Sequence, residues 1–273
     1  MIEWLDTHYH FDFIQASDQR HEFCGELSKE ALGIVAQTVT PSGYIALMQE
    51  LEDSNMEAKN VIPSLGFHPW WYVQVDSIEA ELSHFEQSLK DTRMIGEIGL
   101  DFSAKRIKIM NSSQQKSIFQ SLIQKICHHG IKYSKQFILS IHAVNSATEV
   151  LEILDTYDPN RQVLIPILHR FNGTSDELTR HIRNGGYISV HPQMFQSKKG
   201  RAYLKQIPAE RLLLETDLPN TADEEMPIQQ FISELKHTLI TTIDQLIDLR
   251  QEDLKMQIAK NQQFLYQVND PSR

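Results

Sequence analysis

Short apolar runs recur along the chain, separated by longer stretches in which apolar and polar residues alternate with helical spacing. Eight of these runs have the length and the aliphatic content that are typical of buried parallel strands. The predicted strands are residues 2–5, 33–39, 61–67, 94–100, 137–141, 163–168, 187–190 and 212–214. Strands that alternate with helices predict a parallel sheet, because each parallel strand needs a long crossover before the next one.

The stretches between these runs predict amphipathic helices. The clearest are residues 77–90, 113–128, 146–157 and 175–183, and residues 227–268 predict two further helices at the C-terminal end. Ser77, with Ala80 and Glu81 close behind it, and Ser146, with Glu149 three residues later, predict side-chain caps at the starts of two helices.

Eight strand–helix repeats favour a closed (β/α)8 TIM-type barrel of the α/β class over an open, doubly wound sheet. A Gly-rich phosphate loop of the kind that follows the first strand of nucleotide-binding folds is missing from this sequence. A linker rich in Pro, Gly or Ser is missing too. We therefore expect residues 1–273 to form a single barrel domain with extra C-terminal helices.

Composition narrows the class of protein. The chain has 273 residues, 41% of them hydrophobic, and a formal net charge of −10, which disfavours a broad basic surface for long nucleic acid. The sequence shows neither a signal peptide nor an apolar run of membrane-spanning length. With only Cys24 and Cys127, we expect reduced thiols in a cytoplasmic protein with no membrane attachment, and no disulfide framework.

Metal-capable side chains stand at the ends of most predicted strands. They are Asp6, His8 and His10 after the first strand, His68 after the third, Glu97 and Asp101 in the fourth, and His142, His169, Glu215 and Asp217 after later ones. In a barrel the C-terminal strand ends share one face, so these residues are expected to surround a common site. Imidazole nitrogens and carboxylate oxygens suit zinc, manganese and related divalent ions.

Each of these residues also has an ordinary structural explanation. A single His-x-His is weak support for a metal, a strand-end histidine can serve only as a hydrogen-bonding group, and Asp217 can cap a helix. The repetition at strand after strand is what favours a metal site over these alternatives.

Six motifs carry a resemblance to a known family. They are Asp-Thr-His-Tyr-His-Phe-Asp at 6–12, Gly-Phe-His-Pro at 66–69, Gly-Glu-Ile-Gly-Leu-Asp-Phe at 96–102, Ile-His at 141–142, Leu-His-Arg-Phe-Asn-Gly at 168–173 and Leu-Leu-Leu-Glu-Thr-Asp-Leu-Pro at 212–219. With these motifs the sequence resembles the TatD family of metal-dependent deoxyribonucleases, within the amidohydrolase-like barrel group. The resemblance runs from the first predicted strand to the eighth.

The resemblance implies two divalent metal ions (Zn, Mn or Mg). The implied ligands are His8, His10, Glu97 and Asp217 for one ion and Glu97, His142 and His169 for the other, so that Glu97 bridges. Asp217, Glu97 and His68 are the implied catalytic residues. Asp217 would take a proton from the attacking water, and His68 would contact a substrate phosphate unless it is a structural histidine fixed by Pro69.

The sequence departs from the family pattern around the substrate. Val144 stands where an arginine is common after the fifth strand, and Asn220 replaces a usual tyrosine. Arg170 and Asn172 stand where cysteine or serine is more usual. Arginine is a natural phosphate ligand, so one interpretation is that Arg170 takes over the role of the arginine that is missing at Val144. The simpler interpretation is that Arg170 is an exposed arginine at a strand end without a role in substrate binding.

The favoured function is a deoxyribonuclease that cleaves phosphodiester bonds in short or single-stranded DNA, or at DNA ends, as an exonuclease does. Two alternatives stay open: hydrolysis of a small ester, amide or phosphoester, and a partner-dependent subunit of a larger system. Trp70 and Trp71 either stack on an unpaired base or pack on the barrel rim. The basic cluster of Lys198, Lys199 and Arg201 is expected to be a solvated helical face.

Overall fold

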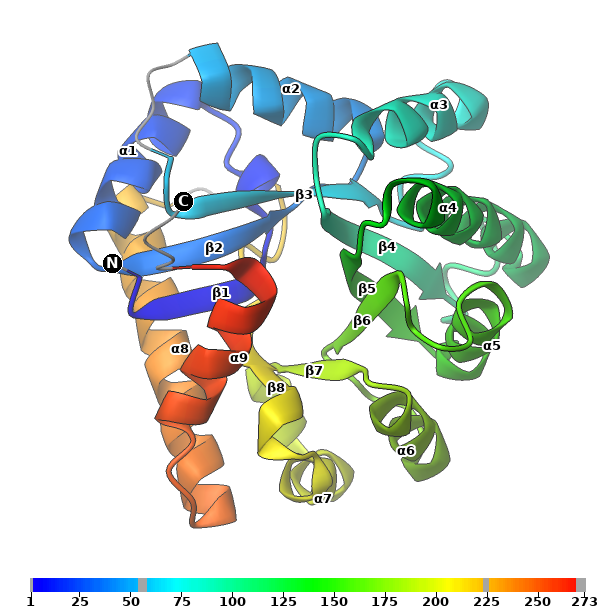
Figure 1. Cartoon of the computed structure of the whole chain (residues 1–273). Coiled ribbons are helices and arrows are strands. Elements are labelled where there is room, and N and C mark those ends of the chain that lie inside the picture. Colours follow the sequence, from blue (N-terminus) through cyan, green and yellow to red (C-terminus); the bar gives the residue numbers. More distant parts are fainter. Residues whose placement is uncertain (1, 54–57, 223–225, 269–273) are drawn as a thin grey trace. The chain divides into compact units, whose positions relative to one another are not determined.

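Eight strands alternate with helices in the computed structural model, which describes residues 2–53, 58–222 and 226–268 (Figure 1). The strands follow one another in the sheet in chain order, from β1 to β8. This topology confirms the (β/α)8 barrel predicted from the sequence. Among the helices of the described ranges, none is long and apolar enough to cross a membrane.

The strand bounds follow the predicted runs closely. They are β1 Trp4–Tyr9, β2 Leu32–Gln37, β3 Val61–Phe67, β4 Met94–Asp101, β5 Phe137–Val144, β6 Leu164–His169, β7 Tyr187–Val190 and β8 Leu212–Leu214. The first strand differs most from its prediction, because it continues through Asp6, Thr7 and His8 instead of ending at Leu5. These three polar side chains are buried, so a strand that looks like a loop by polarity is part of the interior.

Nine α-helices join and extend these strands within the described ranges. They are α1 Ser17–Lys29, α2 Pro41–Asp53, α3 Ile78–Ser88, α4 Ser112–Tyr133, α5 Ala147–Tyr157, α6 Ser175–Arg183, α7 Lys198–Gln206, α8 Ile228–Arg250 and α9 Lys255–Tyr266. The last two confirm the predicted C-terminal helices. Short 3-10 turns lie at Phe11–Phe13, Pro192–Gln196 and Ala209–Arg211.

One of the two predicted side-chain caps is present. The Ser77 hydroxyl accepts a hydrogen bond from the amide of Ala80 at 3.1 Å, as expected at the start of α3. The prediction for Ser146 was wrong: the residue stands at the N-cap position of α5, but its hydroxyl donates to the carbonyl oxygen of Leu100 at 2.8 Å. The hydroxyl is turned toward a buried acceptor at the end of β4, and in this position it accepts no hydrogen bond from an amide of the helix.

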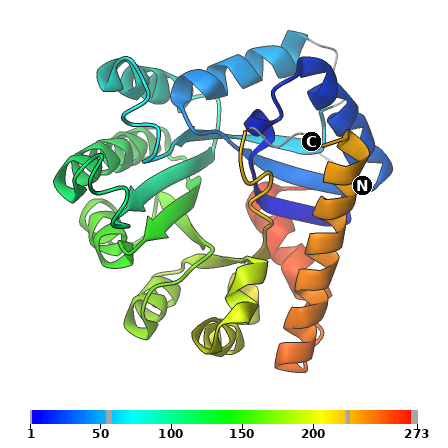
Figure 2. The same ribbon diagram turned by 180° about the vertical axis from the view of Figure 1, so that it is seen from behind.

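The described residues group into two compact units. Unit 1 comprises Met1–Ala36, Leu47–Ile62 and Ile188–Arg273, as far as they are described. Within it, α8 packs beside α1, as Figures 1 and 2 both show. Lys236 of α8 pairs with Glu30, just beyond α1, at 2.7 Å.

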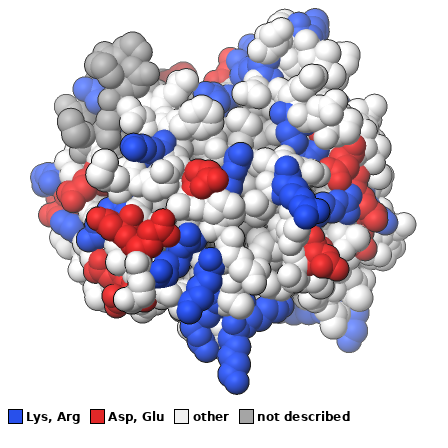
Figure 3. Space-filling view, turned by 60° about the horizontal axis from the view of Figure 1, so that its bottom comes forward, with Lys and Arg blue, Asp and Glu red and all other residues white. Residues whose placement is uncertain are grey.

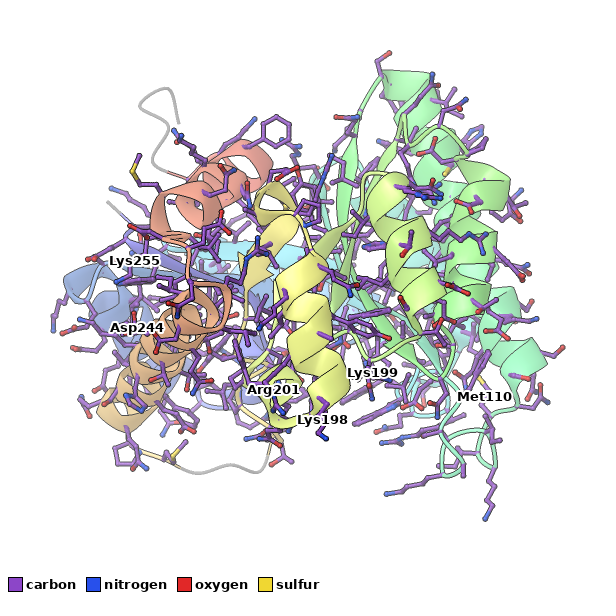
Figure 4. The ribbon with its side chains drawn as sticks, turned by 90° about the horizontal axis from the view of Figure 1, so that it is seen from below. Met110, Lys198, Lys199, Arg201, Asp244 and Lys255 are labelled. Carbon is purple, nitrogen blue, oxygen red and sulfur yellow. The ribbon has the colours of Figure 1, made fainter. Side chains whose placement is uncertain are left out.

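The C-terminal helix of unit 1 is fixed to the strands by buried amide side chains. Asn261 donates to the carbonyl oxygens of Ala209 and Leu212 at 2.9 and 2.8 Å, and Gln262 donates to that of Leu5 at 2.9 Å. These bonds satisfy strand-end carbonyl groups that would otherwise be buried without partners. Asp244 and Lys255, labelled in Figure 4, add an exposed ion pair of 3.5 Å between α8 and α9.

Unit 2 comprises Gln37–Ala46 and Pro63–Tyr187, and contains β4, β5 and β6 with α3 to α6. The strands pair in parallel, with Ile98 beside Ile141 and Asp101 beside Val144. The long helix α4 buries one apolar face, to which Cys127 belongs. Gly130 of the same helix approaches Val163 so closely that a side chain there would collide with it.

Candidate metal sites

Unit 1 brings together the paired histidines of β1 and the aspartate that follows β8. The Nε2 atoms of His8 and His10 lie 3.6 and 3.4 Å from Oδ1 of Asp217. His8 is fully buried, and the Asp217 side chain is only 15% exposed, so the three groups meet in a poorly hydrated place. Their ligand atoms lie within 4.8 Å of one another, close enough to share one ion.

Backbone hydrogen bonds hold this triad in register. The amide of Asp217 donates to the carbonyl oxygen of His8 at 3.0 Å, and the amide of His10 donates to that of Leu218 at 2.7 Å. Asp217 adopts a left-handed conformation with a φ of 60°, which is uncommon for a residue other than glycine. The strained turn is paired with β1 on both sides, so the carboxylate is presented to the histidines by the backbone itself.

Asp6 lies beneath the triad and supports the same turn. Its buried carboxyl group accepts hydrogen bonds from the hydroxyl and the amide of Thr216 and from the amide of His8. Burial raises the pKa of Asp6 to about 8, helped by the nearby charge of Glu215 and opposed by these hydrogen bonds. Asp6 therefore acts on the triad through its neighbours, which explains its place in the motif.

The sequence analysis missed His191 as a supporting residue. Its Nε2 lies 3.1 Å from the carbonyl oxygen of Thr216, and its Nδ1 accepts from the amide of Gln193 at 3.1 Å. Because Nδ1 is an acceptor, Nε2 carries the proton and donates to Thr216. The signal was present in the sequence: His191 is followed by proline, as His68 is.

Unit 2 gathers three histidines around a single carboxylate oxygen. Oε1 of Glu97 lies 2.8 Å from Nδ1 of His142, 2.9 Å from Nε2 of His169 and 3.3 Å from Nε2 of His68. The side chains of Glu97, His68 and His169 are buried, and that of His142 is 12% exposed. Each residue comes from a different strand or strand end: β3, β4, β5 and β6.

Close approach of the strands sets this arrangement. A Cβ atom at Gly66 would stand 1.7 Å from the carbonyl oxygen of Thr38 and 2.7 Å from the amide nitrogen of Glu97. Gly99 has a φ of 147°, and a Cβ there would stand 2.0 Å from the carbonyl oxygen of His142. Only glycine fits at these two positions, which is why Gly-Phe-His and Gly-Leu-Asp flank the site.

His68 differs from the other two histidines in its tautomer. The amide of Trp70 donates to Nδ1 of His68 at 3.1 Å, so this nitrogen is an acceptor. In the neutral ring the proton then resides on Nε2, which points to Glu97. A protonated nitrogen is a hydrogen-bond donor and not a metal ligand. His68 therefore belongs to the site as a donor.

Asp101, which the sequence places among the strand-end residues but not among the implied ligands, supports the unit 2 site. Its Oδ2 accepts from the indole Nε1 of Trp70 at 2.6 Å and lies 3.5 Å from Nε2 of His142. Burial by itself would raise the pKa of Asp101, but bonds from His142, Ser103 and Trp70 hold it well below its ordinary value. Burial by itself would lower the pKa of His142. The hydrogen bonds to Asp101 and Glu97 outweigh burial, and the pKa is raised.

The donor atoms fit divalent metal ions in both units. Among the described residues, His8 with His10 and Asp217 forms one possible ligand group, and Glu97 with His68 and His142 forms another, in which the tautomer of His68 favours a hydrogen-bond donor over a ligand. Mixed imidazole and carboxylate sets of this kind are those that zinc and manganese accept. Every one of the six sequence-predicted ligands thus lies beside other predicted ligands of its own unit.

Comparison with known proteins identifies the family. The family model described as TatD related DNase matches residues 5–267, which is nearly the whole chain. The chain belongs to this TatD family. The resemblance inferred from the sequence motifs is confirmed.

Relatives of this TatD protein are distant. A protein named deoxyribonuclease Tat-D from Schizosaccharomyces pombe is 29% identical over 45% of this chain and 37% of its own length, so the chain spans well under half of that relative. A Buchnera aphidicola protein, described as an uncharacterized metal-dependent hydrolase, is 24% identical over 79% of this chain and 80% of its own length. A solved TatD family hydrolase from Entamoeba histolytica has a TM-score of 0.69 at 16% identity, over 97% of this chain and 98% of that one, and shows the same fold.

The positions where the sequence departs from the TatD pattern lie outside the two ligand clusters. Val144 ends β5 with an exposed side chain, and Arg170 is exposed just beyond β6. Lys198, Lys199 and Arg201 project from the start of α7 (Figure 4), and the Arg201 guanidinium donates to the carbonyl oxygen of Phe195. The indole of Trp70, by contrast, donates a hydrogen bond to Asp101 at the edge of the unit 2 site.

Proposed function

We propose that this TatD protein is a divalent-metal-dependent phosphodiesterase that acts on DNA, at ends or on short single strands. His8, His10 and Asp217 hold one ion, and Glu97, His142 and His169 hold the second, drawn from Zn, Mn or Mg. We also propose that residues 1–273 serve as one catalytic domain, because a single family model runs from residue 5 to residue 267.

The convergence of three imidazoles on Oε1 of Glu97 is the observation that carries this proposal. The three nitrogen–oxygen distances are 2.8, 2.9 and 3.3 Å, and Glu97 is 2% exposed. A single carboxylate oxygen has fewer lone pairs than this many donors require, and burial makes unmatched polar groups costly. A divalent ion resolves the mismatch, because it takes the lone pairs of His142 and His169 together with a Glu97 oxygen.

The bound ions, Asp217 and His68 have different roles in hydrolysis. When bound, the divalent ions supply Lewis-acid chemistry, since they lower the pKa of a water molecule and neutralise charge on the phosphate oxygens. Asp217 accepts a proton from the attacking water, whose oxygen joins phosphorus as the bond to the leaving oxygen breaks. His68 donates its Nε2 proton to a phosphate oxygen, and the Trp70 amide holds the ring in the tautomer that this requires.

DNA as the substrate is supported by the family and by relatives with deoxyribonuclease in their names. Figure 3 shows a small group of lysine and arginine side chains at the lower edge of the view, and acidic side chains scattered over the rest of that face. Such a surface favours local contacts with a short strand over a long duplex groove.

The buried free thiols of Cys24 and Cys127 agree with a reducing compartment, and we propose that the protein acts in the cytoplasm.

A small ester or phosphoester is the second candidate substrate. The exposed apolar side chain of Val144, at the end of β5, favours it, because a valine in place of an arginine offers no ligand for the further phosphates of a DNA strand.

The test is hydrolysis of fluorescently labelled single-stranded and double-stranded DNA by protein loaded with Mn, Mg or Zn. We expect cleavage of single strands that disappears in Glu97→Ala. A panel of small esters and phosphoesters, run on the same two proteins, distinguishes the second candidate. A metal-loaded protein that cleaves only the small compounds would exclude DNA, and one that is inert on the whole panel would exclude the hydrolase.

A further inference from the structure

The loop between β4 and α4, residues 102–111, is basic in an acidic protein. It carries Lys105, Arg106 and Lys108 and no acidic residue, whereas the whole chain has a net charge of −10. Lys105 and Lys108 are exposed, and so are the apolar side chains of Ile107 and Ile109. Figure 4 shows the part of the loop near Met110, where long side chains extend away from the ribbon.

This loop has a defined shape. The buried amide of Gln115 on α4 donates to the carbonyl oxygens of Asp101 and Met110 at 2.9 and 3.0 Å, so it ties both ends of the loop together. Inside the loop, the amides of Arg106 and Ile107 donate to the carbonyl oxygen of Ser103 at 3.0 and 3.1 Å. A basic segment held in this way binds with less loss of conformational entropy than a free one.

Arg106 is joined to the candidate metal ligands through one aromatic ring. Its guanidinium carbon lies 3.7 Å from the centroid of the Trp70 ring, in a cation–π stack. The Trp70 ring contacts His142 edge-on and donates its Nε1 proton to Asp101, which lies 3.5 Å from His142. The Arg106 side chain is thus fixed two contacts away from a residue that touches Glu97.

Within the described ranges, the hydrogen-bond donors of the Arg106 side chain are not used. Among the described residues, no carboxylate and no carbonyl oxygen accepts from its guanidinium group, and the same holds for the ammonium groups of Lys105 and Lys108. Stacking covers one face of the guanidinium plane and leaves the in-plane N–H groups directed outward. A planar fork of donors in a fixed position is suited to a phosphate group.

We propose that the β4–α4 loop binds the backbone of a single-stranded nucleic acid, with Arg106 paired to the phosphate nearest the metal ligands of unit 2. Lys105 and Lys108 contact the neighbouring phosphates, and Ile107 and Ile109 offer apolar contact to unpaired bases. This inference rests on the proposed function, for which it names the substrate-recognition element. A duplex is disfavoured because three cations on one short loop cannot follow two strands.

The experiment compares two substrates and two kinds of variant in the full chain loaded with Mn. The substrates are a labelled 12-nucleotide single strand, a length on the order of the site sizes of single-strand binders, and bis(4-nitrophenyl) phosphate, which has no neighbouring phosphates. The loop variants are Arg106→Gln, Arg106→Lys and the double variant Lys105→Ala/Lys108→Ala. The matched control is Lys90→Ala/Lys132→Ala, which removes two exposed lysines near the opposite, N-terminal ends of β4 and β5.

We expect Arg106→Gln to lower kcat/KM for the oligonucleotide at least about tenfold more than for the small diester, mainly through KM. Arg106→Lys restores part of the loss, because it keeps the charge without the planar fork. The double loop variant reduces the dependence of log KM on log salt concentration by about 1.4, since each single-strand phosphate contact contributes about 0.7. The control variant retains the oligonucleotide KM and its salt dependence.

Three outcomes overturn the proposal. One is an oligonucleotide KM and salt dependence that match wild type in Arg106→Gln and in the double loop variant. Another is a wild type that hydrolyses the small diester but not the oligonucleotide. The protein would then be a hydrolase that does not act on nucleic acid. The third is inhibition of labelled-strand hydrolysis by poly-glutamate that is as strong as inhibition by unlabelled oligonucleotide. This result would make the loop a site for acidic peptides.

If the metal-loaded wild type hydrolyses neither substrate, the proposed function fails. The loop is then tested by fluorescence anisotropy with the same labelled strand. Binding that is weakened in Arg106→Gln, and not in the control, supports the loop on its own, and equal binding by both overturns it.

Discussion

The amide of Asp217 donates to the carbonyl oxygen of His8 at 3.0 Å, although the two residues lie more than two hundred positions apart in the chain. The same pair meets again through its side chains, at 3.6 Å between Nε2 and Oδ1. Backbone and side chain therefore depend on each other: the turn that presents Asp217 is built onto the strand that presents His8. Changes to the support of this turn are expected to change metal binding without touching a ligand.

Thr216→Val tests that support. The variant removes the hydroxyl that donates to the buried Asp6 carboxyl group, and we expect the free energy of unfolding to fall by about 2 kcal/mol. Affinity for one ion should fall by about tenfold, as is typical when an outer partner of a ligand is lost. Urea unfolding and metal titration measure the two effects. Thr242→Val is the control, because among the described residues the hydroxyl of this buried threonine bonds to Thr238 of α8 alone, and metal affinity should be retained.

His68→Ala separates a hydrogen-bond donor from a metal ligand. Because the Trp70 amide places the proton of His68 on Nε2, we expect the variant to keep its full metal content while kcat falls by roughly a factor of 100. His68→Gln, whose amide can donate, should recover part of the rate. Metal analysis of the purified variant alongside single-turnover kinetics decides the matter, and loss of an ion from His68→Ala would make it a ligand.

The carboxyl group of Asp155, which is not part of the candidate metal sites, is expected to make the stability of the fold depend on pH. Burial alone would raise the pKa of its carboxyl group, but Arg180 and Arg161 outweigh burial and lower it. Since the folded pKa lies below the unfolded value of 3.8, the stabilisation is present above about pH 4 and is lost as the pH falls through the folded pKa. Asp155→Asn should therefore be less stable than wild type by about 1–2 kcal/mol at pH 7 and equal to it in strong acid.

The control for Asp155 is Glu152→Gln on the same helix, α5, where the carboxylate is exposed. We expect this variant to unfold like wild type from pH 3 to pH 7 in denaturant titrations. A constant difference between Asp155→Asn and wild type across that range would show that the residue acts through packing and not through its charge.

Metal loading should raise thermal stability in steps. An ion at one hundred times its dissociation constant stabilises the folded state by about 2.7 kcal/mol, which corresponds to a rise in Tm of roughly 5–10 °C for a chain of this size. We expect Asp217→Ala to lose about half of the rise seen on adding Mn to the metal-free wild type. Scanning calorimetry of both proteins, with and without the metal, gives the comparison, and an equal rise in the variant would exclude Asp217 as a ligand.

The strand pattern and the ligand motifs could be read from the sequence because both follow local rules. Apolar runs such as those of β7 and β8 are bounded by polar residues, so their limits are visible. The first strand was predicted too short because Asp6, Thr7 and His8 are polar and yet buried, and only tertiary hydrogen bonds make that acceptable.

The supporting residues of the sites were less predictable. His191 and Asp101 act by bonding to Thr216 and to Trp70 and His142, and such contacts depend on which strands become neighbours. The stack of Arg106 on Trp70 joins two loops and has no local signature in either one. Ser146 shows the opposite error, since a good local cap was overridden by a tertiary acceptor.

We expect hydrolysis to require two ions, one held by His8, His10 and Asp217 and the other by Glu97, His142 and His169. The most direct measurement is the metal content per chain, by mass spectrometry of the elements, for wild type, His8→Ala and His169→Ala, together with turnover of a single-stranded oligonucleotide. The account predicts two ions in wild type, one in each variant, and turnover only in wild type. An unchanged metal content in both variants, or full turnover by either one, would contradict it.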